Sequence, residues 1–157
     1  MDEIICRING SEDTLEAKPG ESLREALRRD RDSRGTKDAC EVGKCGACTV
    51  LVDNEPIKSC LVPAHQATDK VVRTVEGIAD LNGEDGLHPV QEAFIEEFGL
   101  QCGYCTPGFI VATVALLREN PDPTDEEIRD YLKGNLCRCT GYTKIFEAVR
   151  TAAERVE

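Results

Sequence analysis

The sequence predicts an α+β protein with a small sheet in its first half and helices in its second half. Up to about residue 79, short apolar runs alternate with turn residues, which is typical of strands. Beyond this point, apolar residues recur at the three- and four-residue spacing of amphipathic helices. A chain of 157 residues can hold one ordinary domain or two small ones. We expect two, over 1–79 and 80–157.

The first half is expected to form a small sheet with one packed helix. Residues 4–10 predict a strand that ends in an Asn-Gly turn. Residues 22–30 predict a helix, because a serine cap precedes apolar residues at helical spacing. Residues 49–60 predict an apolar strand, a turn and a return strand, and residues 70–78 predict a further alternating strand.

The second half is expected to contain four helices. An acidic, glycine-rich segment, 78–88, precedes them and predicts a linker or a long surface loop. Thr106 is expected to cap one helix with Pro107 at its first position, and Thr124 with Glu127 predicts a capping box. The predicted helices cover 89–98, 107–120, 124–134 and 143–155.

Charge and hydropathy restrict the partners. With 30 acidic and 19 basic residues, the formal net charge is −11, which disfavours binding to nucleic acid or to an anionic membrane. The longest apolar stretch, 109–117, is far shorter than the roughly 20 residues of a membrane span, and the N-terminus lacks the pattern of a secretory leader. We therefore expect a cytoplasmic protein without a membrane span, whose partners are other proteins.

Nine cysteines indicate metal binding. In a reducing compartment they are expected to remain thiols, and their spacing suits metal ligands better than a disulfide framework. Cys6 lies on the first predicted strand and is expected to be a small buried apolar residue. The other eight fall into two sets.

The first thiol set has the spacing of a plant-type [2Fe-2S] site, with four, two and eleven residues between successive cysteines. It consists of Cys40, Cys45, Cys48 and Cys60. Gly43 and Gly46 are expected to adopt positive φ, so that the loop curls and its N–H groups approach the sulfurs. A structural zinc site usually has two short C-x-x-C pairs, which this loop fits poorly.

The second thiol set combines a C-x-x-C pair with a C-x-C pair. It consists of Cys102, Cys105, Cys137 and Cys139. Each pair stands just before a predicted helix, so free N–H groups and the positive ends of two helices can face an anionic cluster. The spacing alone leaves iron–sulfur and zinc open.

Three motifs together resemble the iron–sulfur subunit of the xanthine dehydrogenase family, the molybdenum hydroxylases. They are CEVGKCGACTVLVDN at 40–54, QCGYCTPGFI at 101–110 and GNLCRCTGY at 134–142. The resemblance covers essentially the whole chain and includes all eight ligand positions. It implies that the second thiol set also binds a [2Fe-2S] cluster. It further implies a β-grasp, plant-type ferredoxin domain over 1–79 and a four-helix bundle that binds the other cluster over 80–157.

The function implied by this resemblance is electron transfer. Such a subunit passes electrons one at a time from a molybdopterin (molybdenum) centre in a large subunit, through its two clusters, to FAD in a medium subunit. The cluster of the helical domain would lie nearer the pterin, and the ferredoxin-type cluster nearer the flavin. Gln101 and Cys139 match positions that hydrogen-bond the pterin in relatives. No catalytic residue is expected on this chain.

Two other functions are compatible with the same cysteines. A freestanding two-cluster electron carrier would carry the same ligands, and a zinc-stapled interaction module would carry the second thiol set. The sequence does not indicate the substrate of a complex, because the large subunit would bind it.

Overall fold

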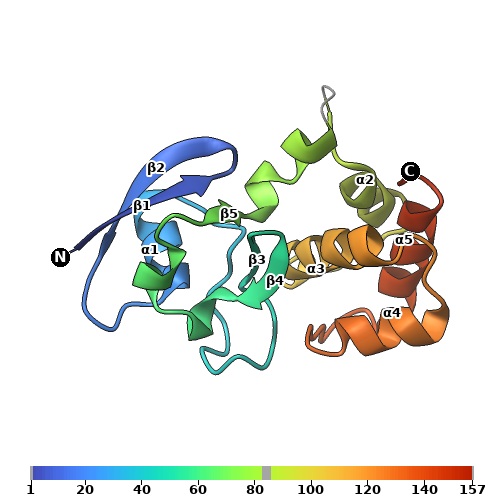
Figure 1. Cartoon of the computed structure of the whole chain (residues 1–157). Coiled ribbons are helices and arrows are strands. Elements are labelled where there is room, and N and C mark those ends of the chain that lie inside the picture. The colour runs from blue at the N-terminus through green and yellow to red at the C-terminus, as the bar shows by residue number, and fades with distance from the viewer. Residues whose placement is uncertain (1, 83–85, 157) are drawn as a thin grey trace.

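The computed structural model describes residues 2–82 and 86–156, and it combines a β-sheet with α-helices (Figure 1). Within the described residues, five strands form one mixed sheet in the order β2-β1-β5-β3-β4. The strands are β1 (Asp2–Ile8), β2 (Ser11–Ala17), β3 (Thr49–Val52), β4 (Glu55–Lys58) and β5 (Val71–Arg73). Two antiparallel hairpins are joined through β5, which runs parallel to β1 and antiparallel to β3.

Helix α1 (Leu23–Asp30) covers the sheet in the first half. Its apolar residues Leu23, Ala26 and Leu27 are completely buried in a core with strand residues such as Ile4 and Val72. Short 3-10 turns fill the remaining connections: η1 (Ser59–Leu61), η2 (Ala64–Ala67), η3 (Val75–Gly77) and η4 (Ala79–Asn82). The predicted arrangement of a small sheet with a packed helix is therefore present.

The second half contains the four predicted helices, all within the described part of the chain. They are α2 (Pro89–Glu96), α3 (Thr106–Glu119), α4 (Asp125–Leu132) and α5 (Thr143–Ala153). Helix α3 is buried along most of its length and packs against α2, α4 and strand β3 (Figure 1). Its apolar run therefore belongs to a core and is not a membrane segment. Among the described residues, no helix has the length and apolar character that crossing a membrane requires.

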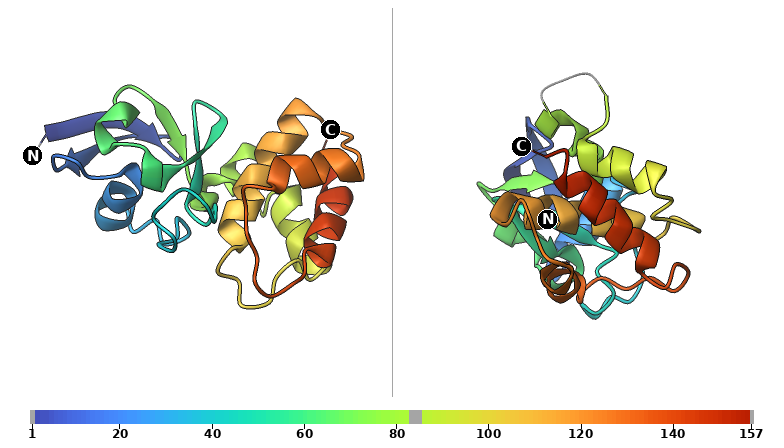
Figure 2. Two further views of the ribbon diagram at one scale, coloured as in Figure 1. Left: turned by 90° about the horizontal axis from the view of Figure 1, so that it is seen from below. Right: turned by 90° about the vertical axis from the view of Figure 1, so that its right-hand side faces the viewer.

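The two halves are in contact (Figure 2). Leu51 of β3 and Ile78, both from the first half, are buried in the apolar core of the helical half together with Phe94, Phe109 and Ile145. This packing holds the helical half against strands β3 and β4 of the sheet, which α3 contacts. The loops that carry the cysteines lie near the same junction.

The structure differs from the sequence expectations at four points. Strand β2 was not predicted, and the predicted strand 70–78 is a strand only at β5, after which the chain turns into η3. The predicted linker 78–88 contains the short turn η4 instead of a plain connection, and its residues 83–85 lie outside the described residues. The beginning of α3 also differs, because Cys105 occupies the cap position and Thr106 lies inside the helix.

Candidate metal centres

The first thiol set lies in the loop between α1 and β3, with Cys60 supplied by the turn η1 after β4. Gly43 and Gly46 have φ values of +70° and +72°, so the predicted left-handed turns are present. A side chain at Gly43 would place its Cβ 2.2 Å from Leu61 Cδ1. The loop is therefore wound closely around its cysteines in a way that requires glycine.

Backbone N–H groups point at the sulfurs of this loop. The amides of Lys44 and Cys45 each donate to Cys40 Sγ at 3.3 Å, and the amide of Ala47 donates to Cys45 Sγ at 3.5 Å. These backbone hydrogen bonds, that of Cys45 foremost, lower the pKa of Cys40 to about 6. Burial, followed by the neighbouring Cys48 thiol, raises the pKa of Cys60 to about 11. The loop thus favours the thiolate at Cys40, which is the form that binds metal.

The second thiol set lies at the beginnings of α3 and α5. Cys105 is the N-cap residue of α3, and Cys137 and Cys139 lie in the turn before α5. The amide and the hydroxyl of Thr140 donate to Cys137 Sγ at 3.4 and 3.2 Å. Burial opposes ionisation of Cys137, but the hydrogen bonds from Thr140, Cys139 and Cys105 together outweigh it and lower the pKa of this thiol. Burial, followed by the Cys137 thiol, raises the pKa of Cys105 to about 12.

Within each set the thiols lie in pairs. Cys102 Sγ and Cys139 Sγ are 3.7 Å apart. The four pairs in contact are Cys40 with Cys45, Cys48 with Cys60, Cys102 with Cys139, and Cys105 with Cys137. A [2Fe-2S] cluster takes two thiolates on each of its irons, so two adjacent pairs suit its donor set. Among the described residues, no three Cys, His, Asp or Glu side chains are arranged to hold a single metal ion.

The structure brings the two predicted pterin contacts to the surface. Gln101 is exposed in the turn before α3, directly before Cys102, and Cys139 is exposed as well. Gln101 is therefore the sequence neighbour of a thiol, Cys102, that is in contact with Cys139. In contrast, Cys6 is buried in the sheet core with 3% of its surface exposed, as predicted, and it belongs to neither set.

Backbone contacts join the two thiol sets. The amide of Leu136 donates to the carbonyl oxygen of Cys45 at 2.8 Å. The buried side chain of Asn135 donates through Nδ2 to Gly46 O at 3.2 Å. Gly108 of α3 faces the same carbonyl, since a Cβ at Gly108 would lie 2.2 Å from Gly46 O. One loop of the first set therefore rests directly on the chain that leads to Cys137.

Sequence reasoning did not find the residues that hold these loops together. Asn135 is one of them. Tyr104, between Cys102 and Cys105, is another, because its hydroxyl donates to the carbonyl of Asp38, two residues before Cys40. Lys37 lies over the Tyr104 ring, with Nζ 5.5 Å from the ring centroid. No local pattern marks such contacts, since the partners are many residues apart.

Exposed apolar side chains border both sets. Val42 and Leu61 are exposed beside the first thiol set, one between its cysteines and one directly after Cys60. Tyr104 and Leu136 are exposed beside the second thiol set, and Phe98, which precedes Cys102 in the chain, is 76% exposed. Clustered apolar residues on a surface commonly mark a protein contact.

Comparisons with known proteins agree with this geometry. Residues 6–74 match the family of 2Fe-2S iron-sulfur cluster binding domains, and residues 74–150 match a second family, the [2Fe-2S] binding domain. The chain is 46% identical to the small FeS subunit of nicotinate dehydrogenase from Eubacterium barkeri, over 97% of this chain and 95% of the relative. It is 45% identical to the small subunit of nicotine 6-hydroxylase from Paenarthrobacter nicotinovorans, over 98% and 91%.

A solved structure shows the same fold. The chain aligns with quinoline 2-oxidoreductase from Pseudomonas putida 86 with a TM-score of 0.91 and 40% identity. The alignment covers 98% of this chain and 94% of the chain in that structure. The sheet and the helices described above therefore match one chain of that oxidoreductase over nearly its whole length.

Proposed function

The chain belongs to the small iron–sulfur subunits of the xanthine dehydrogenase family of molybdenum hydroxylases, and from this we propose that it connects two redox cofactors of a larger complex. It is the iron–sulfur subunit of an oxidoreductase, and its own cofactors are two [2Fe-2S] clusters. The proposal is that it passes electrons one at a time from a molybdopterin centre in a large subunit to FAD in a medium subunit. Each cluster, when bound, accepts and releases a single electron.

The proposed ligands are the eight paired cysteines. The first cluster takes Cys40, Cys45, Cys48 and Cys60, and the second takes Cys102, Cys105, Cys137 and Cys139. Two observations support this assignment: the thiols lie in adjacent pairs, and N–H groups or hydroxyls point at Cys40, Cys45 and Cys137. Such donors stabilise the negative charge on thiolate sulfur.

The proposed domains are a plant-type β-grasp ferredoxin domain over 1–79 and a helical cluster-binding domain, a four-helix bundle, over 80–157. The two matching families meet at residue 74, close to this boundary. Each half also has a buried apolar core of its own, although Leu51 and Ile78 belong to the helical one. All nine cysteines are free thiols, in keeping with a location in the reducing cytoplasm.

One contact carries the proposal that the clusters act in series. The hydrogen bond from Leu136 N–H to Cys45 O joins a ligand of the first cluster to the residue next to Cys137, a ligand of the second. A short covalent and hydrogen-bonded path therefore runs from one proposed site to the other. Gln101 and Cys139 are exposed beyond the second site, where the pterin of the large subunit is proposed to bind. Val42 and Leu61 are exposed beside the first site, on the proposed flavin side.

Rapid-freeze EPR of the assembled complex tests this order. We expect the [2Fe-2S] signal of the helical half to couple magnetically to Mo(V). The replacement Cys45→Ser should remove or alter the uncoupled signal and block electron delivery to the flavin, whereas Cys137→Ser should disrupt electron exit from molybdenum. If an intact Cys45→Ser complex loses the molybdenum-coupled signal, the order is reversed. If the chain copurifies with no molybdenum subunit and no coupling occurs, it is a freestanding carrier.

A further inference from the structure

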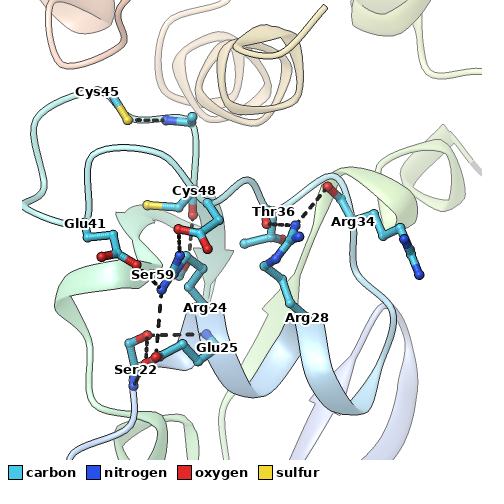
Figure 3. A network of polar contacts seen from close by, with 12 residues as sticks. Ser22, Arg24, Glu25, Arg28, Arg34, Thr36, Glu41, Cys45, Cys48 and Ser59 are labelled. Atoms are coloured by element: carbon cyan, nitrogen blue, oxygen red, sulfur yellow. Dashed lines mark hydrogen bonds and ion pairs between the residues drawn. The ribbon is translucent and has the colours of Figure 1, made fainter.

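Arg24 of α1 reaches into the loop that carries the first thiol set. Its side chain is buried, with only 6% of its surface exposed, and it contacts the residues on both sides of Cys40. Nη1 forms an ion pair with the Asp38 carboxylate, and Nη2 donates to Glu41 Oε1 at 2.9 Å. Figure 3 shows the guanidinium beside Glu41. A single cation thus ties together the chain before and after a proposed ligand.

The helix that presents Arg24 is held by its own cap and by the sheet. Ser22 and Glu25 form a capping box at its beginning, and Leu23 and Leu27 are completely buried against the sheet. One turn further on, Arg28 donates to the carbonyl oxygen of Thr36 at 3.0 Å (Figure 3). Helix α1 therefore supports the loop of the first thiol set. Arg24 contacts this loop closer to Cys40 than Arg28 does.

Three carboxylates compensate the charge of Arg24, and none of them is buried: those of Asp38, of Glu41 and of Glu25, whose Oε1 lies 3.9 Å from Arg24 Nη2. Asp38 and Glu41 are about half exposed, at 50% and 61%, so water screens their carboxylates more than it screens the guanidinium. Arg24 Nε is buried and has no hydrogen-bond partner among the described residues. A buried cation of this kind exerts its field on the protein interior, where screening is weak.

We infer that Arg24 is a positioning residue for the first cluster, which it serves in two ways. It holds the Cys40 segment in place through Asp38 and Glu41, and its positive charge favours the reduced, more negative state of the cluster. The inference rests on the proposed ligation of that cluster by the first thiol set. The second cluster, in the same chain, provides an internal reference for both effects.

The test is a redox titration of the reconstituted full chain with dithionite, followed by EPR. The signals of the two clusters are first assigned with Cys45→Ser and Cys102→Ser variants. In Arg24→Gln, the equilibrium constant for one-electron reduction of the first cluster should fall about tenfold, a shift of about 59 mV to lower potential. The potential of the second cluster should not change.

Glu41→Gln separates charge from general loosening of the loop. It removes a negative charge at an exposed position, so the first-cluster potential should rise, opposite to the change in Arg24→Gln. Arg24→Lys keeps the charge but not the fork that spans two carboxylates. Its potential should stay near that of the original protein, while a chelator should remove iron from its first cluster faster. Because Glu41 is exposed, its variant carries the test even where Arg24→Gln fails to fold.

Arg29→Gln is the matched control. Arg29 lies on the same helix and pairs with the carboxylates of Glu21 and Asp30, and we place it in no cluster contact. It should leave both potentials and both chelation rates unchanged. The inference is overturned if Arg24→Gln and Glu41→Gln bind both clusters with unchanged first-cluster potentials. It is also overturned if the two substitutions shift the first-cluster potential in the same direction. If the unsubstituted full-length chain binds no cluster at the first thiol set, the result contradicts the proposed ligation and not the role of Arg24.

Discussion

Gly108, in the first turn of α3, allows the two cysteine-bearing loops to approach each other backbone to backbone. A Cβ at this position would lie 2.2 Å from Gly46 O and 3.2 Å from Ala47 Cα, both of them backbone atoms. Backbone cannot move aside as a flexible side chain can. The close contact between the thiol sets therefore depends on the absence of one methyl group.

Gly108→Ala should lower the free energy of unfolding by about 2 kcal/mol, because it overpacks a site that has no room to relax. Thermal unfolding of the cluster-loaded chain measures this change. Gly134→Ala is the control, since its Cβ would meet only the flexible end of Lys58, at 3.2 Å from Nζ. The control should stay within about 0.5 kcal/mol of the original protein. Equal stability of the two variants would contradict the importance of this contact.

The sequence predicts some of these residues and not others for a physical reason. Cysteine spacing is local, and the same loop dictates the positive φ of Gly43 and Gly46, which the structure contains. Asn135 and Tyr104 act through partners that are 89 and 66 positions away. Only the folded chain brings those partners together, so no local pattern could reveal them.

Among the secondary-structure elements, α1 matters most to the first proposed site, because it supports the loop that carries Cys40. Its N-terminus is closed by reciprocal hydrogen bonds: the amide of Ser22 donates to Glu25 Oε2 at 2.9 Å, and the amide of Glu25 donates to Ser22 Oγ at 3.3 Å. The hydrogen bonds from Ser22 lower the pKa of Glu25 below its ordinary value of 4.5. The cap is therefore fully formed above that pH, and its contribution is lost only as the pH falls through the lowered pKa.

Ser22→Ala should cost about 1 kcal/mol of unfolding free energy. The penalty should be the same at pH 8 and pH 6, because the Glu25 carboxylate is ionised throughout this range in both the folded and the unfolded chain. Unfolding temperatures at the two pH values provide the measurement. Ser11→Ala, at an exposed position at the start of β2, should cost almost nothing. A penalty that changes between pH 8 and pH 6 would show that another titrating group controls the cap.

Elements with strong local signals were predicted, and elements defined by their partners were not. Helix α3 follows from its apolar run, the proline near its beginning and Asn120 at its end. Strand β2 is largely polar, and of its residues only Leu15 and Ala17 are buried. It is a strand because it pairs with β1 at every position, a property of the sheet and not of the segment. The same holds for η3, where the chain leaves the sheet directly after β5.

At the scale of the whole molecule, the two halves share a core and a hydrogen-bonded contact between their thiol sets. Leu51 and Ile78 anchor the helical core to the sheet, and the bond from Leu136 to Cys45 joins the cysteine-bearing loops. The eight thiols thus form two neighbouring sites in one rigid frame. We propose that each of these sites holds a [2Fe-2S] cluster.

The test is to measure iron, zinc and acid-labile sulfide in the purified chain, together with the EPR spin count after dithionite reduction. With four thiolates for each two-iron cluster, we expect about four iron and four sulfide per chain, no stoichiometric zinc and two spins. About two iron per chain with one zinc and a single spin would contradict the claim, because the second thiol set would then be a structural zinc site and the chain could not carry electrons through two clusters in series.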